Sequence, residues 1–312
     1  MGLDTDRKFE AIEVVRAGFE DVGYVCSRQI ATTLYLAHHL QKPILVEGPA
    51  GVGKTELAKA AAAYLKKPLI RLQCYEGLDE SKALYEWKYG KQLLYTQILK
   101  DKLADLLEGT DGLADAVARV HNYDDIFFSE HFLAPRPLLL ALQEKEGAVL
   151  LVDEVDRSDQ EFEAFLLEVL SDFQVSVPEL GTIQAVSRPD VFLTSNNTRE
   201  MSEALKRRCL HLYIPFPDAR LEREIVRVRA PGVSERLRGQ LVAFVQQLRK
   251  LDLKKVPSVS ETLDWARVLT ILNARDLGAD LIRDTFNIIL KFEVDIEMVE
   301  GRLHEMAEKA VR

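Results

Sequence analysis

The sequence predicts an α/β fold in which a parallel sheet between helices carries a phosphate-binding loop and an all-helical domain follows. Three observations support this prediction. Short apolar segments alternate with segments of helical periodicity as far as residue 214. Residues 48–55 match the pattern G-x-x-x-x-G-K-T and lie between an apolar segment and a helix-forming one. Beyond residue 218 the periodicity is helical throughout.

The phosphate-binding loop and the residue after it are the predicted nucleotide contacts. Glycines let consecutive backbone N–H groups turn toward a polyphosphate because no Cβ stands in the way. Lys54 is expected to place a cation on the β- and γ-phosphates, and the Thr55 hydroxyl to bind Mg²⁺. The following helix presents its N-terminus to the same phosphates. The predicted ATP site therefore contains Gly48, Pro49, Ala50, Gly51, Val52, Gly53, Lys54, Thr55 and Glu56.

Composition limits the classes to which the protein can belong. The 312 residues suit two domains, and 47% hydrophobic with 29% charged residues is typical of a soluble globular protein. The N-terminus lacks the features of a signal peptide and the apolar runs are too short to span a bilayer, so we expect a cytoplasmic location without a transmembrane segment. A net charge of −9 argues against non-specific nucleic-acid binding.

Cysteine and histidine spacing indicates no further site. Three scattered cysteines are too few for a disulfide framework and are expected to be small buried side chains. The adjacent His38 and His39 diverge by roughly 100° on a helix, so they cannot easily share a metal. The metal we expect is the Mg²⁺ that accompanies the nucleotide.

The N-terminal half is expected to hold helices over residues 7–40, broken at Gly23 and Tyr24, and then two strands that flank the phosphate-binding loop and its helix. These strands are predicted at residues 44–47 and 68–73. A long insertion follows at about 74–147 and shows no strong strand signal. Its helices are predicted near residues 91–107, 112–120 and 137–146.

The apolar segment 148–154 is a predicted buried strand that ends in two carboxylates, Asp153 and Glu154. Parallel sheets place their chemistry at this end of the strands. Asp153 is expected to hold Mg²⁺ through water, and Glu154 to orient and deprotonate the attacking water. The alternative is a strand that ends in a solvated acidic turn, but the upstream phosphate-binding loop favours the catalytic interpretation.

The remainder of the first domain is predicted to contain a helix, a β-hairpin and two strands. Ser158 and Glu161 form a capping-box pattern that opens the helix. Alternating residues around a glycine-containing loop predict the hairpin at about 174–186. The two strands are expected at residues 190–197 and 210–214. We predict one domain at residues 1–218 and a helical lid at 219–312.

The order of these parts resembles the AAA+ ATPases, and more closely their MoxR clade. The segment 153–158, the helix ending at Leu170 and the hairpin resemble the MoxR signature. The segment 71–87, together with 127–133, resembles the CoxD-like subgroup. The resemblance covers about residues 20–300 and implies a P-loop AAA+ core with a helical lid.

The resemblance also implies roles for single residues. Asn196 is the expected polar sensor near the γ-phosphate, although an asparagine can simply cap the end of a strand. Arg208 matches the arginine finger of the family, with Arg207 as the alternative. The purely structural alternative is that these arginines are basic residues at a helix end, where they interact with the helix dipole. In the family this arginine reaches the nucleotide of a neighbouring subunit, so the resemblance implies a ring, usually a hexamer. Tyr24 corresponds to the adenine-contacting region, although a plain helix break explains it nearly as well.

One position departs from the MoxR pattern. The clade has an arginine early in the lid as a second sensor, and Glu261 occupies that place here. Either Arg267, further along the same helix, substitutes for it, or lid closure is coupled to ATP differently.

The implied function is ATP hydrolysis that drives conformational work on another protein. The CoxD-like resemblance implies maturation of a molybdenum–copper carbon monoxide dehydrogenase or a related molybdenum hydroxylase, with a von Willebrand factor A-domain protein as adaptor. Two other classes stay open. A nucleic-acid motor is disfavoured by the acidic charge and by a hairpin without lysine or arginine. An ATP-gated scaffold with negligible turnover is favoured by the missing second-sensor arginine.

Overall fold

The computed structural model describes residues 7–98, 130–178 and 180–311. Its centre is a five-stranded parallel sheet with the strand order β2-β5-β8-β1-β9. The apolar segments predicted as strands all pair within it. The strands are β1 (Ile44–Glu47), β2 (Leu69–Gln73), β5 (Val149–Asp153), β8 (Asp190–Ser195) and β9 (Leu210–Tyr213).

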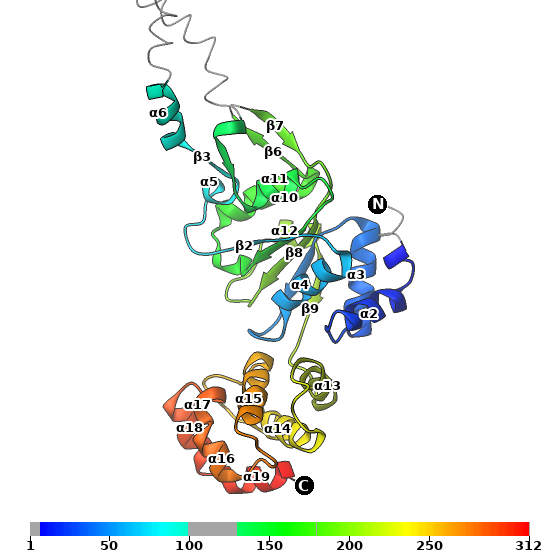
Figure 1. Cartoon of the computed structure of the whole chain (residues 1–312), viewed down its shortest axis with the longest axis vertical. Coiled ribbons are helices and arrows are strands. Elements are labelled where there is room, and N and C mark those ends of the chain that lie inside the picture. Colours follow the sequence, from blue (N-terminus) through cyan, green and yellow to red (C-terminus); the bar gives the residue numbers. More distant parts are fainter. Residues whose placement is uncertain (1–6, 99–129, 179, 312) are drawn as a thin grey trace, which may run out of the picture.

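Helices cover both faces of this sheet because successive strand residues point to opposite sides and most of them are apolar. One face packs Leu45, Leu150 and Leu193 against three helices. They are α10 (Pro137–Gln143), α11 (Gln160–Asp172) and α12 (Glu203–Arg208). The other face packs Val46 and Leu151 against α2 (Ile12–Asp21), α3 (Arg28–Leu40) and α4 (Lys54–Leu65). The core is thus a three-layer αβα sandwich (Figure 1).

The insertion contains a small sheet that sequence patterns did not indicate. Strand β3 (Tyr85–Trp87) pairs antiparallel with β4 (Leu133–Pro135). The expectation of no strand between 74 and 147 was therefore wrong, because each strand has only three residues and its partner lies far along the chain. The other elements of this region are α5 (Glu80–Ala83), α6 (Tyr89–Ile98) and the 3₁₀ helix η1 (Glu130–Phe132). The predicted helix at 112–120, and the part of the helix at 91–107 beyond residue 98, lie outside the described residues.

The helix after β5 begins one residue later than the sequence pattern suggested. A 3₁₀ turn, η2 (Val155–Arg157), comes first, and the Ser158 hydroxyl donates back to the Val155 carbonyl oxygen at 2.7 Å. The cap of α11 is instead Asp159, whose carboxylate accepts from the Phe162 N–H at 2.9 Å. The predicted hairpin is present as β6 (Gln174–Val177) and β7 (Gly181–Gln184).

Everything after β9 is helical, as predicted, and these helices pack around a hydrophobic cluster of their own that includes Trp265 and Phe244. They lie together below the sheet in Figure 1. The periodicity at 281–292 is divided between two short helices at Thr285. The helices of this region are α13 (Ala219–Arg229), α14 (Glu235–Leu248), α15 (Val259–Ile271), α16 (Ala279–Asp284), α17 (Phe286–Ile289), α18 (Glu293–Glu300) and α19 (Leu303–Val311). No helix in the described part of the chain is long and apolar enough to cross a membrane.

Candidate nucleotide site

A polar cavity of about 280 Å³ lies at the carboxyl ends of β1, β5 and β8. Its lining includes Lys54, Asp153, Glu154 and Asn196. Lys54, the adjacent Asp153 and Glu154, and Asn196 come from three distant parts of the sequence, and the strand order β5-β8-β1 brings them together at one edge of the sheet. The cavity is therefore where the predicted catalytic residues meet.

The phosphate-binding loop, residues 48–53, is held in a conformation that favours glycine at both of its ends. Gly48 has a φ of +147° and a Cβ there would lie 2.1 Å from the Ile214 carbonyl oxygen. Gly53 has a φ of +100° but open space around its missing Cβ. Such backbone angles are readily accessible to glycine alone. Ala50 lines the polar cavity, whereas Val52 is buried and borders the neighbouring one.

The Lys54 ammonium is hydrogen-bonded to backbone carbonyl oxygens of this loop. It donates to the carbonyl oxygens of Gly48 and Pro49 at 2.6 and 2.7 Å, and to Asn196 Oδ1 at 2.8 Å. The residue is only 6% exposed. Burial lowers the pKa of Lys54 below its usual value, against the opposing effect of the Asp156, Asp153 and Glu154 carboxylates. A buried cation at the start of a helix suits a polyphosphate.

The predicted metal ligands lie side by side. The Thr55 hydroxyl is 3.1 Å from Asp153 Oδ1, and Asp153 is buried. The Thr194 hydroxyl, which sequence patterns did not indicate, donates to the same Oδ1 at 2.5 Å. A hydroxyl oxygen next to a buried carboxylate is the donor set that Mg²⁺ prefers, so these residues fit the ion. No other protein ligand is needed, since Mg²⁺ usually keeps several waters and phosphate oxygens.

Glu154 is held by donors on both carboxylate oxygens. Asn196 Nδ2 donates to Oε1 at 3.3 Å, and Gln73 Nε2 donates to Oε2 at 3.0 Å. Arg157 Nε lies 3.0 Å from Oε2 as well. The backbone of Glu154 is left-handed, with a φ of 56°, a conformation that non-glycine residues adopt rarely and often at functional sites. Both oxygens of the Glu154 carboxylate are thus engaged by protein donors.

Asn196 is fixed through its backbone by a carboxylate that the sequence analysis overlooked. Asp156 Oδ2 accepts from the N–H groups of Asn196 and Thr198, at 3.2 and 2.9 Å, and from the Thr198 hydroxyl at 2.6 Å. Burial raises the pKa of Asp156, but the hydrogen bonds from Thr198 and Asn196 outweigh it and leave the pKa below its usual value. Asp156 therefore stays ionised and holds the loop that carries the sensor candidate.

The two arginine-finger candidates differ in their surroundings. Arg207 pairs with Glu203 at 3.1 Å, one turn earlier on α12. Arg208 is exposed at the end of the helix, and no carboxylate within the described residues pairs with it. It does not border the cavity of its own chain. Arg208 is thus the candidate that is free to reach another molecule.

A second cavity, of about 230 Å³ and mostly apolar, adjoins the polar one through Gly51, Gly53, Glu56 and Ser260. It lies between the sheet domain and helices α13 and α15, and Tyr24 lines it. Burial raises the pKa of the Tyr24 phenol well above its usual value, so the ring stays neutral. A mostly apolar cavity beside the phosphate-binding loop suits a nucleobase.

Two ion pairs lie at the border of this second cavity, and one of them connects the two domains. Glu56 and Arg229 form an ion pair with a 2.8 Å N–O distance. Arg267 also lines this cavity and pairs with Asp264 at 2.9 Å. Arg267 does not border the polar cavity, so it does not occupy the position of a phosphate sensor in this conformation.

Glu261 does not point at the phosphate-binding loop either. Its carboxylate accepts from the Ser258 N–H at 2.8 Å and lies 2.6 Å from Lys255 Nζ, which completes a capping box for α15. The residue that faces the loop is Ser260, whose N–H donates to the Gly51 carbonyl oxygen at 3.2 Å. The first turn of α15 therefore meets the loop directly, without a basic side chain between them.

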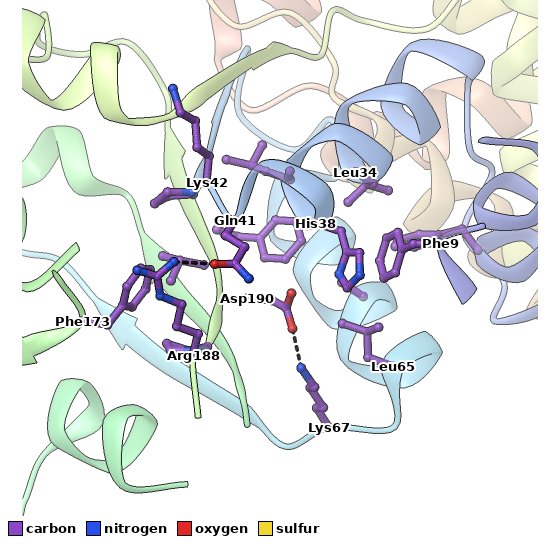
Figure 2. A pocket seen from close by; sticks show the side chains of 18 residues that line it. Phe9, Leu34, His38, Gln41, Lys42, Leu65, Lys67, Phe173, Arg188 and Asp190 are labelled. Atoms are coloured by element: carbon purple, nitrogen blue, oxygen red, sulfur yellow. Dashed lines mark hydrogen bonds and ion pairs between the residues drawn. The ribbon is translucent and has the colours of Figure 1, made fainter. Parts of the chain in front are cut away.

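A third cavity, of about 150 Å³, lies at the opposite edge of the sheet, where β1 and β8 begin. Figure 2 shows two pairs among the polar side chains that line it. Lys67 lies 2.8 Å from Asp190, and Arg188 donates to Gln41 at 2.6 Å. The His38 ring stacks on Phe9. None of the residues predicted to bind the nucleotide lines this third cavity.

Similarity to known proteins agrees with this geometry. Residues 43–209 match the family described as AAA domain (dynein-related subfamily). An uncharacterized protein of Staphylococcus epidermidis is 25% identical over 246 residues, which cover 77% of this chain and 79% of that protein. An uncharacterized protein of Staphylococcus aureus is 23% identical over 245 residues, 75% and 80% of the two chains.

Among solved structures, the Thermotoga maritima RuvB Holliday junction branch migration motor aligns with a TM-score of 0.46 and 17% identity over 86% of this chain and 68% of its own. A mutant of the same RuvB aligns with a TM-score of 0.47 and 17% identity over 86% and 69% of the two chains. The family match spans the phosphate-binding loop, the carboxylate pair, the sensor strand and both candidate arginines. This chain therefore belongs to the AAA domain family, in its dynein-related subfamily.

Proposed function

We propose that this protein is a Mg²⁺-dependent ATPase whose catalytic site is completed by a neighbouring subunit. The observation that carries the proposal is the meeting of Lys54, Asp153, Glu154 and Asn196 at one cavity, although they lie on three different strands or loops. The apolar cavity beside it supplies space for a purine. Within one site the chain thus offers groups for the base, the phosphates, the metal and the attacking water.

Each residue then has a defined role. Lys54 exchanges its loop carbonyl acceptors for phosphate oxygens, and Thr55 and Asp153 hold Mg²⁺, whose bound charge stabilises the phosphates. Glu154 orients a water and accepts its proton. Asn196, which is hydrogen-bonded to both Lys54 and Glu154, fixes the position of the base relative to the ammonium that binds the phosphates. Thr194 holds the Asp153 carboxylate in place.

We further propose that Arg208 is the arginine finger and that the active form is a ring, such as a hexamer. Arg208 is exposed, lacks an ion pair within the described residues and does not border its own cavity. A charge of this kind supplied by a neighbour typically accelerates hydrolysis by about 10³–10⁵-fold. Arg207, which pairs with Glu203, is the internal comparison.

The proposed biological role is remodelling of a client protein, as in the MoxR clade. The support is the sequence resemblance of segments 71–87 and 127–133 to CoxD-like proteins. On that basis the client is a molybdenum hydroxylase of the carbon monoxide dehydrogenase type, and the adaptor a von Willebrand factor A-domain protein. Deletion of the gene should then lower the metal content of that hydroxylase without lowering its polypeptide level.

The test of the ATPase proposal is the solution mass of Glu154→Gln with and without ATP and Mg²⁺. Loss of the base traps ATP, so we expect a nucleotide-dependent rise to the mass of a ring. Adding Arg208→Ala to this variant should weaken ring formation, whereas adding Arg207→Ala, which breaks a pair with Glu203, should have a much smaller effect. A Glu154→Gln protein that binds ATP tightly yet stays monomeric at all concentrations contradicts the shared site.

Turnover of the wild-type protein separates this proposal from an ATP-gated scaffold. We expect steady phosphate release that Glu154→Gln abolishes. Tight ATP binding with turnover below about one per hour, against typical values of about 1–100 s⁻¹ for phosphoryl-transfer enzymes, would favour the scaffold.

A further inference from the structure

Arg71 on the edge strand β2 already occupies the carboxylate that Mg²⁺ needs. Its Nη2 lies 2.5 Å from Asp153 Oδ2. The Asp153 side chain is 3% exposed, whereas that of Arg71 is 50% exposed. A buried carboxylate without a direct partner is costly, so in this conformation Arg71 supplies Asp153 with a directly paired cation.

Both Asp153 oxygens are already engaged while Arg71 is in place. Its Oδ1 accepts from the hydroxyls of Thr194 and Thr55, and its Oδ2 is bound by Arg71 and lies 3.3 Å from the Thr55 hydroxyl. A divalent ion that approaches Asp153 Oδ2 is repelled by the Arg71 guanidinium, which is bound to the same oxygen. Loading of the metal therefore requires Arg71 to move away from Asp153 or to share it unfavourably.

The same guanidinium also reaches the catalytic base through one intermediate. Arg71 Nη2 donates to Gln73 Oε1 at 2.5 Å, and Gln73 Nε2 donates to Glu154 Oε2 at 3.0 Å. Because both contacts use the Gln73 amide, the bond from Arg71 fixes which end of this amide faces Glu154. Arg71, Gln73, Asp153 and Glu154 thus form one connected chain of polar contacts.

We propose that Arg71 is a positioning residue that stands in for Mg²⁺ before nucleotide arrives and couples metal loading to release of the base. When the metal takes Asp153, Arg71 leaves it, Gln73 loses its fixed orientation, and Glu154 exchanges the Gln73 donor for water. This inference rests on the proposed ATPase function and adds an order of events to it. The protein binds nucleotide first as a metal complex and only then frees its base.

The test compares Arg71→Met with Arg71→Lys, both in the Glu154→Gln background so that ATP is not hydrolysed. The measurement is the Mg²⁺ concentration that half-saturates binding of a fluorescent ATP analogue. We expect Arg71→Met to lower this concentration by roughly tenfold, because no cation competes for Asp153. Arg71→Lys keeps the charge and should stay within about threefold of the parent.

A second readout is the thermal midpoint, measured first without ligand and then with Mg²⁺ and ATP. The thermal midpoint of Arg71→Met without ligand should fall, because Asp153 loses its partner, and saturating Mg²⁺ and ATP should recover it. Gln73→Ala removes one contact of Arg71 and cuts the connection to Glu154 but leaves the Arg71–Asp153 pair, so its half-saturating Mg²⁺ concentration should fall much less than that of Arg71→Met.

The outcomes separate this inference from the proposed function. If the parent protein binds the ATP analogue with Mg²⁺, but Arg71→Met requires the same or more Mg²⁺, Arg71 does not compete with the metal and the inference is wrong. If the parent protein does not bind the analogue at all, it is the proposed ATPase function that fails.

Discussion

At the scale of single residues, Asp156 controls where the sensor candidate lies. Replacing it with alanine removes the acceptor for the N–H groups of Asn196 and Thr198. Since Asp156 lines neither the polar nor the apolar cavity, we expect the turnover rate of Asp156→Ala to fall by about 10²-fold or more, as small misplacements of catalytic groups do. ATP affinity should change by less than about threefold.

Steady-state kinetics together with equilibrium binding measure this difference. Asp156→Asn is the matched control, because its amide oxygen can still accept from the loop and should restore part of the rate. An equal loss of rate and of ATP affinity in Asp156→Ala would mean that the residue supports the whole domain rather than the sensor loop.

The sequence indicates the chemical groups of the site better than their supports. Lys54, Thr55, Asp153 and Glu154 belong to short local motifs, so their meeting could be expected. Arg71 and Asp156 act through contacts with residues far along the chain, and an isolated arginine or aspartate carries no local signal. The MoxR pattern has its second-sensor arginine where this chain has Glu261, and the structure shows Glu261 in the capping box of α15.

At the scale of elements, the phosphate-binding loop tests backbone geometry directly. Gly48→Ala must push its Cβ into the Ile214 carbonyl oxygen, whereas Gly53→Ala meets no neighbour within 4 Å. Both positions have positive φ, so both substitutions carry backbone strain of about 1–3 kcal/mol. We expect Gly48→Ala to lower the thermal midpoint and abolish ATP binding, and Gly53→Ala to be the milder change.

Thermal unfolding and titration with ATP measure the two variants side by side. The clash, rather than the loss of glycine itself, is the predicted cause of the difference. Equal loss of stability in the two variants would show that backbone strain alone dominates.

Elements with strong local periodicity were predicted well, and those defined by distant pairing were not. The five strands of the main sheet are apolar and flanked by turns, so their sequence carries the signal. The β3–β4 pair has three residues in each strand, and its pairing depends on how the insertion folds back. The Ser158 and Asp159 side chains are equally good caps, and only the 3₁₀ turn after Glu154 selects the second.

At the scale of the whole molecule, the Glu56–Arg229 ion pair ties the helical domain to the nucleotide-binding helix α4. Burial raises the pKa of Glu56, but the hydrogen bond and charge of Arg229 outweigh it and hold the pKa below its usual 4.5. The pair therefore stabilises the folded protein fully above pH 4.5, and this contribution is lost as the pH falls through the lowered value.

Both side chains are about one third exposed, so the contribution is about 0.2–1 kcal/mol. We expect Glu56→Gln and Arg229→Gln each to lower the thermal midpoint at pH 7 by about 1–3 °C, with no further loss in the double variant. In acid the difference in thermal midpoint between each variant and the wild type should shrink. A difference that grows on acidification would contradict the assigned pair.

The position of β1 in the sheet has a consequence for how the protein is made. This strand carries the phosphate-binding loop, yet its two neighbours are β8 and β9, and residues 48–189 separate it from the nearer of them. During synthesis β1 leaves the ribosome long before either partner exists. The nascent chain therefore carries an unpaired apolar strand until β8 and β9 emerge, and it is exposed to aggregation during that interval. Nucleotide can stabilise the fold only after β8 and β9 have paired with β1, because only then is its binding site complete.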